Sequence, residues 1–168
     1  CSVYEAGLRI PFIARWPGKI ASGAVDKSSL FSAVDLLPTF CEVAGVKLPE
    51  TYSPDGLSQV SALTGHGDAN RQKPLFWKMQ SGWPARSHQP YHWVSYAIVD
   101  QNWKLVTNRD SSYVELFDLT ADPYEKADLK EKEPEVVKLL LEKLSQWQAT
   151  LPAKPTGDVF SAERTASR

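Results

Sequence analysis

The sequence lacks several features that mark particular classes of protein. No apolar run approaches the roughly 20 residues that span a bilayer, and no signal-peptide pattern opens the chain. Basic residues are not in excess: 19 Lys and Arg stand against 20 Asp and Glu, and a net charge of -1 gives no indication of a nucleic-acid partner. With 168 residues, 42% of them hydrophobic, the chain can bury a core in one domain, with or without a small appendage.

Cysteine and histidine are also scarce. The two cysteines are Cys1, at a terminus, and Cys41, in a helical pattern, so idle or buried thiols are favoured over a disulfide. His88 and His92 have the i, i+4 spacing of a metal-binding pair. Pro90 lies between them and breaks the helix that this spacing requires, and no third ligand is near. The sequence therefore predicts no metal site.

The first third of the chain carries short apolar elements. Residues 10–16 form an almost uninterrupted apolar run, which is typical of a strand buried on both faces. Asp35 stands at the N-cap position of a helix and Gly45 at its C′ position. The apolar residues of this helix follow helical spacing: Leu36, Leu37, Phe40, Val43 and Ala44. A brief helix over 57–63 is predicted to end at Gly65.

The pattern changes from helical to strand-like at Pro74. Four segments rich in aromatic and β-branched residues follow: 75–79, 92–99, 103–107 and 114–119. Their short connections favour an antiparallel meander of about four strands. Pro134 begins a last helix with one apolar stripe, predicted to cover one face of the meander: Val137, Leu140, Leu141, Leu144, Trp147 and Leu151. Residues 152–168 are small and polar and are expected to form a flexible tail.

Several short motifs resemble, in order and spacing, those of the type I (arylsulfatase-like) sulfatases. The string YEAGLRIP at 4–11 is similar to the family's Y-E-G-G-x-R-x-P block, with Ala6 in place of a glycine. Four further strings follow in register: D-L-x-P-T at 35–39, D-G-x-S…L-x-G at 55–65, a D-W-K-L-like strand at 102–105, and L-Y-D-L-x-x-D-P-x-E at 116–125. The resemblance covers about 2–151 and extends to N-acetylgalactosamine-6-sulfatases.

The resemblance implies a fold and a place within it. The fold class is α/β (α+β), the alkaline-phosphatase-like C-terminal region of a sulfatase over 1–151. Within it, 1–65 would be a remnant of the large-sheet domain, and 74–151 a small antiparallel sheet with its helix. A catalytic half is expected upstream.

The resemblance also implies chemistry that this sequence does not carry. These enzymes use a nucleophile in a C-x-P-x-R or S-x-P-x-R string, oxidised to formylglycine, and acidic ligands for calcium. Neither string is present, and Cys41 is followed by EVAG, so it is not the nucleophile. A sulfate-contacting lysine of the family would fall just ahead of Cys1. We therefore predict no catalytic or metal-binding residue and no hydrolysis of sulfate esters by this chain alone.

Substrate contacts are the remaining candidates. Arg9 suits a sulfate oxyanion, and the alternative is a structural ion pair with Glu5. Aromatic rings mixed with cations between 76 and 93 suit a sulfated sugar, in a region that borders the substrate pocket of the resembling enzymes. The candidates there are Lys78, Trp83, Arg86 and His88. In the alternative, Trp77 and Trp93 are strand residues that pack under the last helix.

Three hypotheses of function follow. The first is the C-terminal part of a sulfatase, whose parent would be periplasmic, secreted or lysosomal. The second is a free-standing carbohydrate-binding or interaction module that uses the loop 83–93, and the third is a structural fragment that only assembles. A strand over 10–16 without its neighbours would present apolar side chains and unpaired backbone to water, so we expect a homodimer through this segment.

Overall fold

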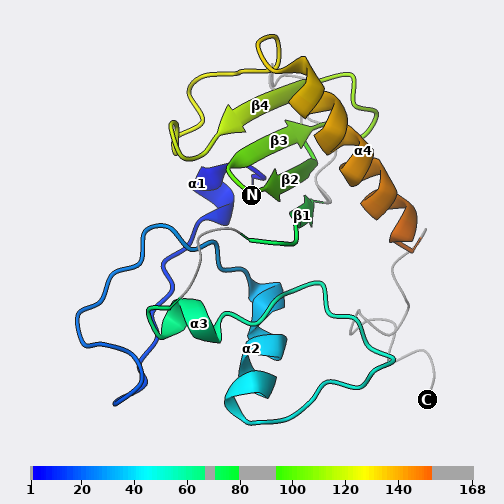
Figure 1. The fold of residues 1–168 in the computed structure, drawn as a ribbon. Coiled ribbons are helices and arrows are strands. Elements are labelled where there is room, and N and C mark those ends of the chain that lie inside the picture. The colour runs from blue at the N-terminus through cyan, green and yellow to red at the C-terminus, as the bar shows by residue number, and fades with distance from the viewer. Residues whose placement is uncertain (1, 67–70, 80–93, 153–168) are drawn as a thin grey trace, which may run out of the picture.

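A computed structural model of the chain describes residues 2–66, 71–79 and 94–152. Figure 1 shows a sheet with one long helix in the upper part of the molecule and two shorter helices in the lower part. We call residues 2–9, 74–79 and 94–152 the sheet lobe, and residues 10–66 the N-terminal lobe. No helix in these described ranges is long and apolar enough to cross a membrane.

The sheet is an antiparallel meander. Its strands are β1 (Leu75–Lys78), β2 (Tyr96–Asp100), β3 (Trp103–Thr107) and β4 (Val114–Asp118). They lie in the order β1-β2-β3-β4, and every pair is antiparallel. The predicted four-stranded meander is confirmed. Residues 92 and 93 of the second predicted strand lie outside the described residues.

The helix α4 (Pro134–Thr150) packs across one face of this sheet (Figure 1). Its apolar stripe meets the side chains of the central strands, and the buried core contains Tyr96, Ile98, Leu105, Leu116, Leu140 and Leu144. Phe76 stacks on Trp147 with ring centroids 5.0 Å apart and planes within 7°. The predicted cover of the meander is confirmed. Trp77 is a correction: it packs on the opposite face, because side chains alternate along β1 and its neighbour Phe76 faces α4.

The start of the chain covers the second face of the sheet. Val3 is buried in the small core there, and Tyr4 meets Phe117 edge to face at 6.4 Å. The short helix α1 (Glu5–Leu8) follows. Gly7 is required at its position, since a Cβ there would lie 2.3 Å from the carbonyl oxygen of Ser2. The sheet therefore lies between α4 on one face and the N-terminal residues on the other, two segments that are far apart in sequence.

The segment 10–16 is the main departure from the sequence prediction. It forms no strand, and its apolar side chains are exposed, Ile13 to 91%. A strand buried on both faces needs hydrogen-bonded neighbours and covering helices, and no described segment supplies them. One local contact remains, a stack of Phe12 on Phe31 with centroids 4.3 Å apart.

The rest of the N-terminal lobe contains three short helices. A 3-10 turn (Ala33–Asp35) leads into α2 (Leu36–Val43), and α3 (Val60–Leu63) follows. Gly45 has φ +67 just past α2, as predicted for a C′ glycine. The helix predicted over 57–63 is shorter, because the amide of Leu57 donates to the side chain of Asp35 rather than entering α3.

Candidate functional site

The residues predicted to bind substrate are only partly described. Arg9 follows α1 and is exposed, and Lys78 ends β1 and is also exposed. No hydrogen bond or ion pair joins these two side chains within the described part of the chain. Trp83, Arg86 and His88 lie outside the described residues, so their roles stay predictions. The ion pair between Arg9 and Glu5 is not formed, because Glu5 pairs with a lysine of the sheet instead.

That lysine is Lys104, the side chain of β3 that projects toward the start of the chain. It is fully buried, and its Nζ lies 2.8 Å from Glu5 Oε1 and 2.8 Å from Glu125 Oε1. The Glu5 amide donates to Glu125 Oε2 at 2.6 Å, so the two carboxylates and the lysine form one connected network. A buried ammonium requires such carboxylate partners, because an unpaired charge in the protein interior has a large desolvation cost.

A second network lies beside the first on the same face of the sheet. Glu115 of β4 accepts hydrogen bonds from the hydroxyls of Tyr4 and Tyr113, the latter at 2.8 Å. Burial, followed by the bond to Glu115, raises the pKa of Tyr4 far above its ordinary value. The bond to Glu115 is the main cause that raises the pKa of Tyr113 to about 12. Both tyrosines therefore stay neutral donors at physiological pH.

Together these networks hold Tyr4 and Glu5, the beginning of the YEAG string, on the sheet. Sequence reasoning missed them. One signal was available: Lys104 alternates with Trp103 and Leu105 and is the one charged residue of its strand, which indicates a charge that points to the second face of the sheet. Its carboxylate partners lie 99 and 21 residues away, and no local pattern links them.

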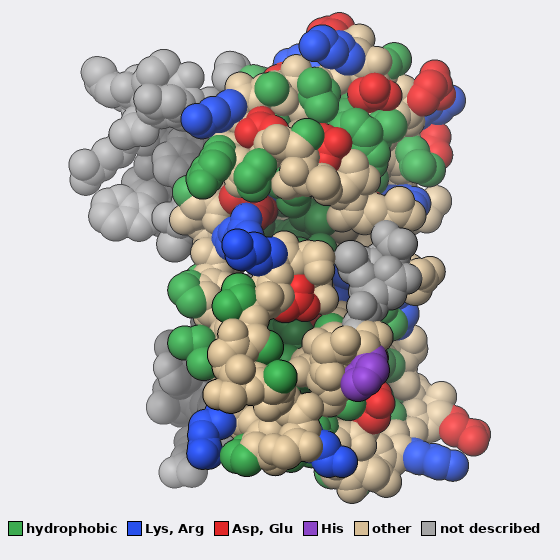
Figure 2. Space-filling view, turned by 60° about the vertical axis from the view of Figure 1, so that its left-hand side comes forward, with side chains coloured by type: hydrophobic (Ala, Val, Ile, Leu, Met, Phe, Trp, Pro, Cys, Tyr) green, Lys and Arg blue, Asp and Glu red, His purple; other side chains and the backbone are tan. Residues whose placement is uncertain are grey.

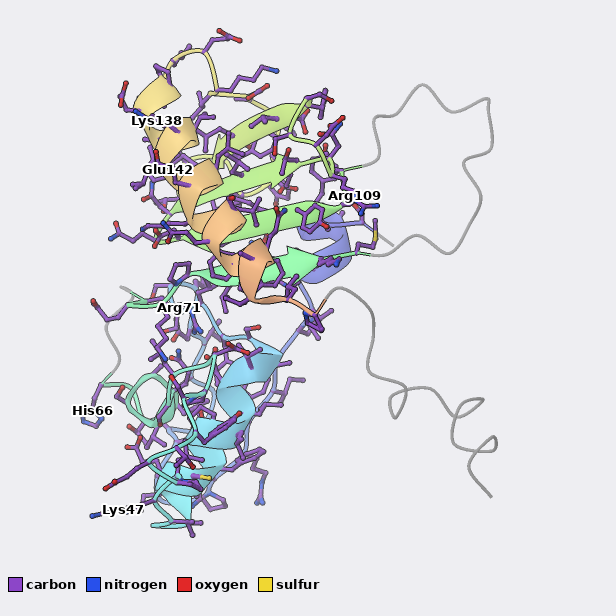
Figure 3. The ribbon with its side chains drawn as sticks, turned by 90° about the vertical axis from the view of Figure 1, so that its right-hand side faces the viewer. Lys47, His66, Arg71, Arg109, Lys138 and Glu142 are labelled. Atoms are coloured by element: carbon purple, nitrogen blue, oxygen red, sulfur yellow. The ribbon has the colours of Figure 1, made fainter. Side chains whose placement is uncertain are left out.

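A third buried pair fastens the N-terminal lobe. Arg71 donates from both terminal nitrogens to the carboxylate of Asp35, each at 2.8 Å, and both side chains are almost fully buried. Asp35 also accepts from the amides of Ser32 and Leu57, each at 2.8 Å. Figure 3 shows Arg71 where the chain enters the sheet lobe from below. One carboxylate therefore holds the start of α2, the approach to α3 and the segment before β1 together.

Next to this pair the chain is tightly packed. A Cβ on Gly56 would lie 2.0 Å from the carbonyl oxygen of Val34, so only glycine fits where the two segments cross. The DG pair at 55–56, singled out by the sequence, is thus explained by packing. Asp55 itself is exposed.

The outer surface of the N-terminal lobe is apolar. Twelve large hydrophobic residues are exposed in the described ranges, and ten of them lie between Ile10 and Tyr52. Figure 2 shows hydrophobic side chains reaching the surface of this lower part of the molecule. Scattered exposed apolar residues are normal in globular proteins, whereas in the described ranges they are concentrated in this lobe.

Metal-binding donors are not gathered in the described part of the chain. No group of three or more His, Cys, Asp or Glu side chains there is arranged to hold a metal ion. The buried carboxylates are already matched to Lys104, Arg71 or tyrosine hydroxyls. Cys41 is a half-buried free thiol. The sulfatase resemblance implies a calcium site in the catalytic half, and the described residues of this chain offer no ligand set for one.

Comparison with known proteins places the whole described fold in one family. Residues 2–150 match the family model "N-sulphoglucosamine sulphohydrolase, C-terminal". An N-acetylgalactosamine-6-O-sulfatase of Bacteroides thetaiotaomicron is 31% identical over 85% of this chain and 28% of its own length. Arylsulfatase K of Bos taurus is 31% identical over 85% of this chain and 26% of its own length.

A solved structure supports the same relationship. A protein of Bacteroides thetaiotaomicron, from a study of its metabolism of multiple glycosaminoglycans, is 28% identical with a TM-score of 0.64. The match covers 88% of this chain and 31% of that protein. The fold is thus the α/β (α+β), alkaline-phosphatase-like arrangement expected from the motifs. The chain spans between a quarter and a third of the length of each of these three relatives. The chain belongs to the sulfatase family, and it corresponds to the C-terminal region of these enzymes.

Proposed function

We propose that this chain is the non-catalytic C-terminal part of a sulfatase and hydrolyses no sulfate ester by itself. The observation that carries the proposal is the family match over 2–150, the C-terminal region, in a sequence that has neither nucleophile string. The described residues also offer no ligand set for calcium. The chemical step therefore belongs to a catalytic portion outside this sequence.

Within such an enzyme the sheet lobe has a supporting role. The networks around Lys104 and Glu115 hold the YEAG string rigidly against the sheet. In the resembling enzymes a sulfate-contacting lysine precedes this string by about four residues, so the sheet would fix the chain next to the reacting sulfate. Arg9, exposed just beyond α1, is our candidate for contact with an anionic substrate.

The substrate class is a sulfated sugar, a proposal supported by the names of the relatives, such as N-acetylgalactosamine-6-O-sulfatase and N-acetylglucosamine-6-O-sulfatase. The compartment that we propose for the parent enzyme is periplasmic, secreted or lysosomal. The free-standing carbohydrate-binding module stays a prediction, because Trp83, Arg86 and His88 lie outside the described residues. Binding of the chain to a sulfated-glycan array is its direct test.

The test of the main proposal is turnover of 4-nitrophenyl sulfate by the purified chain in the presence of calcium. We expect no release of 4-nitrophenol above a heat-killed control. Enzymes accelerate such reactions by a factor on the order of 10⁶ or more, and substrate binding without a nucleophile or a metal ion does not supply that acceleration. Release that depends on the native protein would overturn the proposal.

A further inference from the structure

A shallow groove of about 670 Å³ runs along one flank of α4, beside the hairpin that joins β3 to β4. Its apolar lining comes from Pro134, Val137 and Leu141 of the helix, and Ser111 of the hairpin also lines it. Val137 and Leu141 pack against the core of the sheet lobe and are partly exposed. We call this feature the α4 groove.

Both walls of the α4 groove are held in place. In the hairpin, the amide and the hydroxyl of Ser112 donate to Asp110 Oδ1 at 3.1 and 2.7 Å. Asn108 Nδ2 donates to the hydroxyl oxygen of Ser112 at 2.8 Å. The helix is anchored by the buried side chains of Leu140 and Leu144. Neither wall can readily collapse, so the groove stays open to an occupant.

Charged side chains restrict what fits there. Lys138 and Glu142 line the groove on the half of α4 nearer its start (Figure 3), and within the described ranges neither forms an ion pair. Three exposed acids lie at or just before the start of the helix: Glu131, Glu133 and Glu135. The matching occupant is a peptide with an apolar side chain for the groove and a positive charge beyond it.

The end of this chain has that pattern. Residues 153–168 lie outside the described part of the structure, and their only large hydrophobic side chains are the adjacent pair Val159 and Phe160. Arg164 and Arg168 follow this pair. Gly157 precedes it and favours a reversal of the chain. Among the residues that follow α4, the apolar pair and the positive charges therefore come in the order that the groove requires.

The length of the segment also fits. A helix rises about 1.5 Å per residue, so Leu141 lies about 15 Å back along the axis from Leu151. Residues 152–160 span up to about 30 Å when extended, which leaves enough chain to turn back and place Phe160 beside Leu141. The tether gives an effective concentration on the order of millimolar, so even a weak contact would be populated.

We propose that residues 158–164 fold back along α4 and dock Val159 and Phe160 in the α4 groove, with Arg164 directed toward the acids at the start of the helix. This arrangement differs from the flexible tail expected from composition, because composition does not register the groove. The proposal concerns the chain by itself and does not depend on the proposed function.

The experiment is nuclear magnetic resonance of the full, isotope-labelled chain. Backbone order parameters report whether residues 158–162 are ordered, and nuclear Overhauser effects report contact between the Phe160 ring and the methyl groups of Val137 and Leu141. The tail variant is Phe160→Asp. Its matched control is Thr156→Asp, which adds the same charge to the same segment outside the apolar pair.

We expect order parameters above about 0.6 at Val159 and Phe160, with contacts to both methyl groups, and values below about 0.6 in Phe160→Asp. Thr156→Asp should behave like the wild type. Wild-type values below about 0.6 overturn the proposal. It is also overturned if the order survives Phe160→Asp, or if Thr156→Asp removes it equally.

A variant of the groove tests the other side of the contact. Ser145 lines the groove and is exposed, so Ser145→Trp should fill the groove and abolish the contacts of Phe160 without unfolding the chain. Leu139→Trp is the control, because Leu139 is 50% exposed on the same helix and does not line the groove. Contacts that persist in Ser145→Trp place the tail elsewhere and overturn the proposal.

The tail of a second copy is the other occupant to test, in keeping with the homodimer predicted from the sequence. A mixture of labelled and unlabelled chains separates the two cases. Contacts between Phe160 and the groove that arise only between different chains assign the groove to exchange of tails and overturn the proposal. Contacts within one chain that persist on dilution support it.

Discussion

Two buried cations organise this chain, and each is matched to carboxylate in a way that suits its chemistry. The guanidinium of Arg71 makes two parallel bonds to the single carboxylate of Asp35. The ammonium of Lys104 is instead a point charge, shared between Glu5 and Glu125. The first pair sets the direction of a helix, and the second attaches the start of the chain to the sheet. Neither Arg71→Lys nor Lys104→Arg would preserve the geometry.

Asp35→Ala should destabilise the chain by about 3–5 kcal/mol, because it leaves Arg71 buried without a counter-charge and two amides without their acceptor. Urea unfolding followed by circular dichroism measures the loss. The control is Asp55→Ala, since Asp55 is exposed and should change stability by less than about 0.5 kcal/mol. Equal, small effects of both substitutions would show that the buried pair contributes little.

The bond between Tyr113 and Glu115 predicts a dependence of stability on alkaline pH. The pKa of Tyr113 is raised from 10.0 to about 12 in the folded chain, so folding favours the neutral phenol. The stabilisation is therefore fully present below about pH 10 and is lost as the pH rises through about 12. Phenolate absorbance, taken as wild type minus Tyr113→Phe, measures this titration. In Glu115→Gln the midpoint of this difference titration, which reports the pKa of Tyr113, should fall toward the ordinary value of 10.0. An unchanged midpoint would exclude Glu115 as the cause of the raised pKa.

At the scale of elements, α4 is held to the sheet by side chains whose burial differs sharply along one helix. Leu144→Ala should lower the free energy of unfolding by about 2–5 kcal/mol, because this side chain is fully buried between the helix and the sheet. Leu139→Ala removes the same atoms from an exposed position and should cost less than about 0.5 kcal/mol. Equilibrium unfolding in urea compares the two. Similar losses would mean that α4 does not pack in the observed register.

Sequence patterns predicted those elements whose partners lie within the chain. The third strand was predicted with its observed bounds, Trp103–Thr107, and α4 with its stripe, because alternation and helical spacing report burial against a nearby core. The run 10–16 carries an equally strong apolar signal but forms no strand, because its pattern specifies burial against neighbours that no described segment provides. The helical spacing of apolar residues also predicted α2. It did not predict that the apolar side chains of this helix would face the solvent.

The candidate site was predicted less completely than the fold. Arg9 and Lys78 were identified by charge and are exposed as a substrate contact requires, yet their contact with substrate remains untested. Lys104 and Arg71 were missed, because the pairing of a buried cation with carboxylates distant in sequence depends on tertiary structure. The alternative that paired Arg9 with Glu5 is not observed, because Glu5 forms its ion pair with Lys104 of the sheet.

The whole molecule combines a closed lobe and an open one. The sheet lobe has a core on each face of the sheet, covered by α4 and by residues 3–8. The N-terminal lobe carries most of the exposed large hydrophobic residues in the described ranges. The chain corresponds to 28% of one relative and 26% of another. In the function that we propose, a catalytic portion outside this sequence carries out the chemical step and this chain supports it.

The attachment of residues 4 and 5 to the sheet also bears on biosynthesis. Tyr4 bonds to a side chain 111 positions later, and Glu5 reaches partners 99 and 120 positions later. A ribosome makes residues 4 and 5 before their anchors, which emerge only after the whole meander and the loop beyond it have been translated. Such distant pairings also slow folding, because a long loop must close before they form. The YEAG string is therefore synthesised ahead of all of its anchors, and it is secured only after the meander and the loop beyond it have been made.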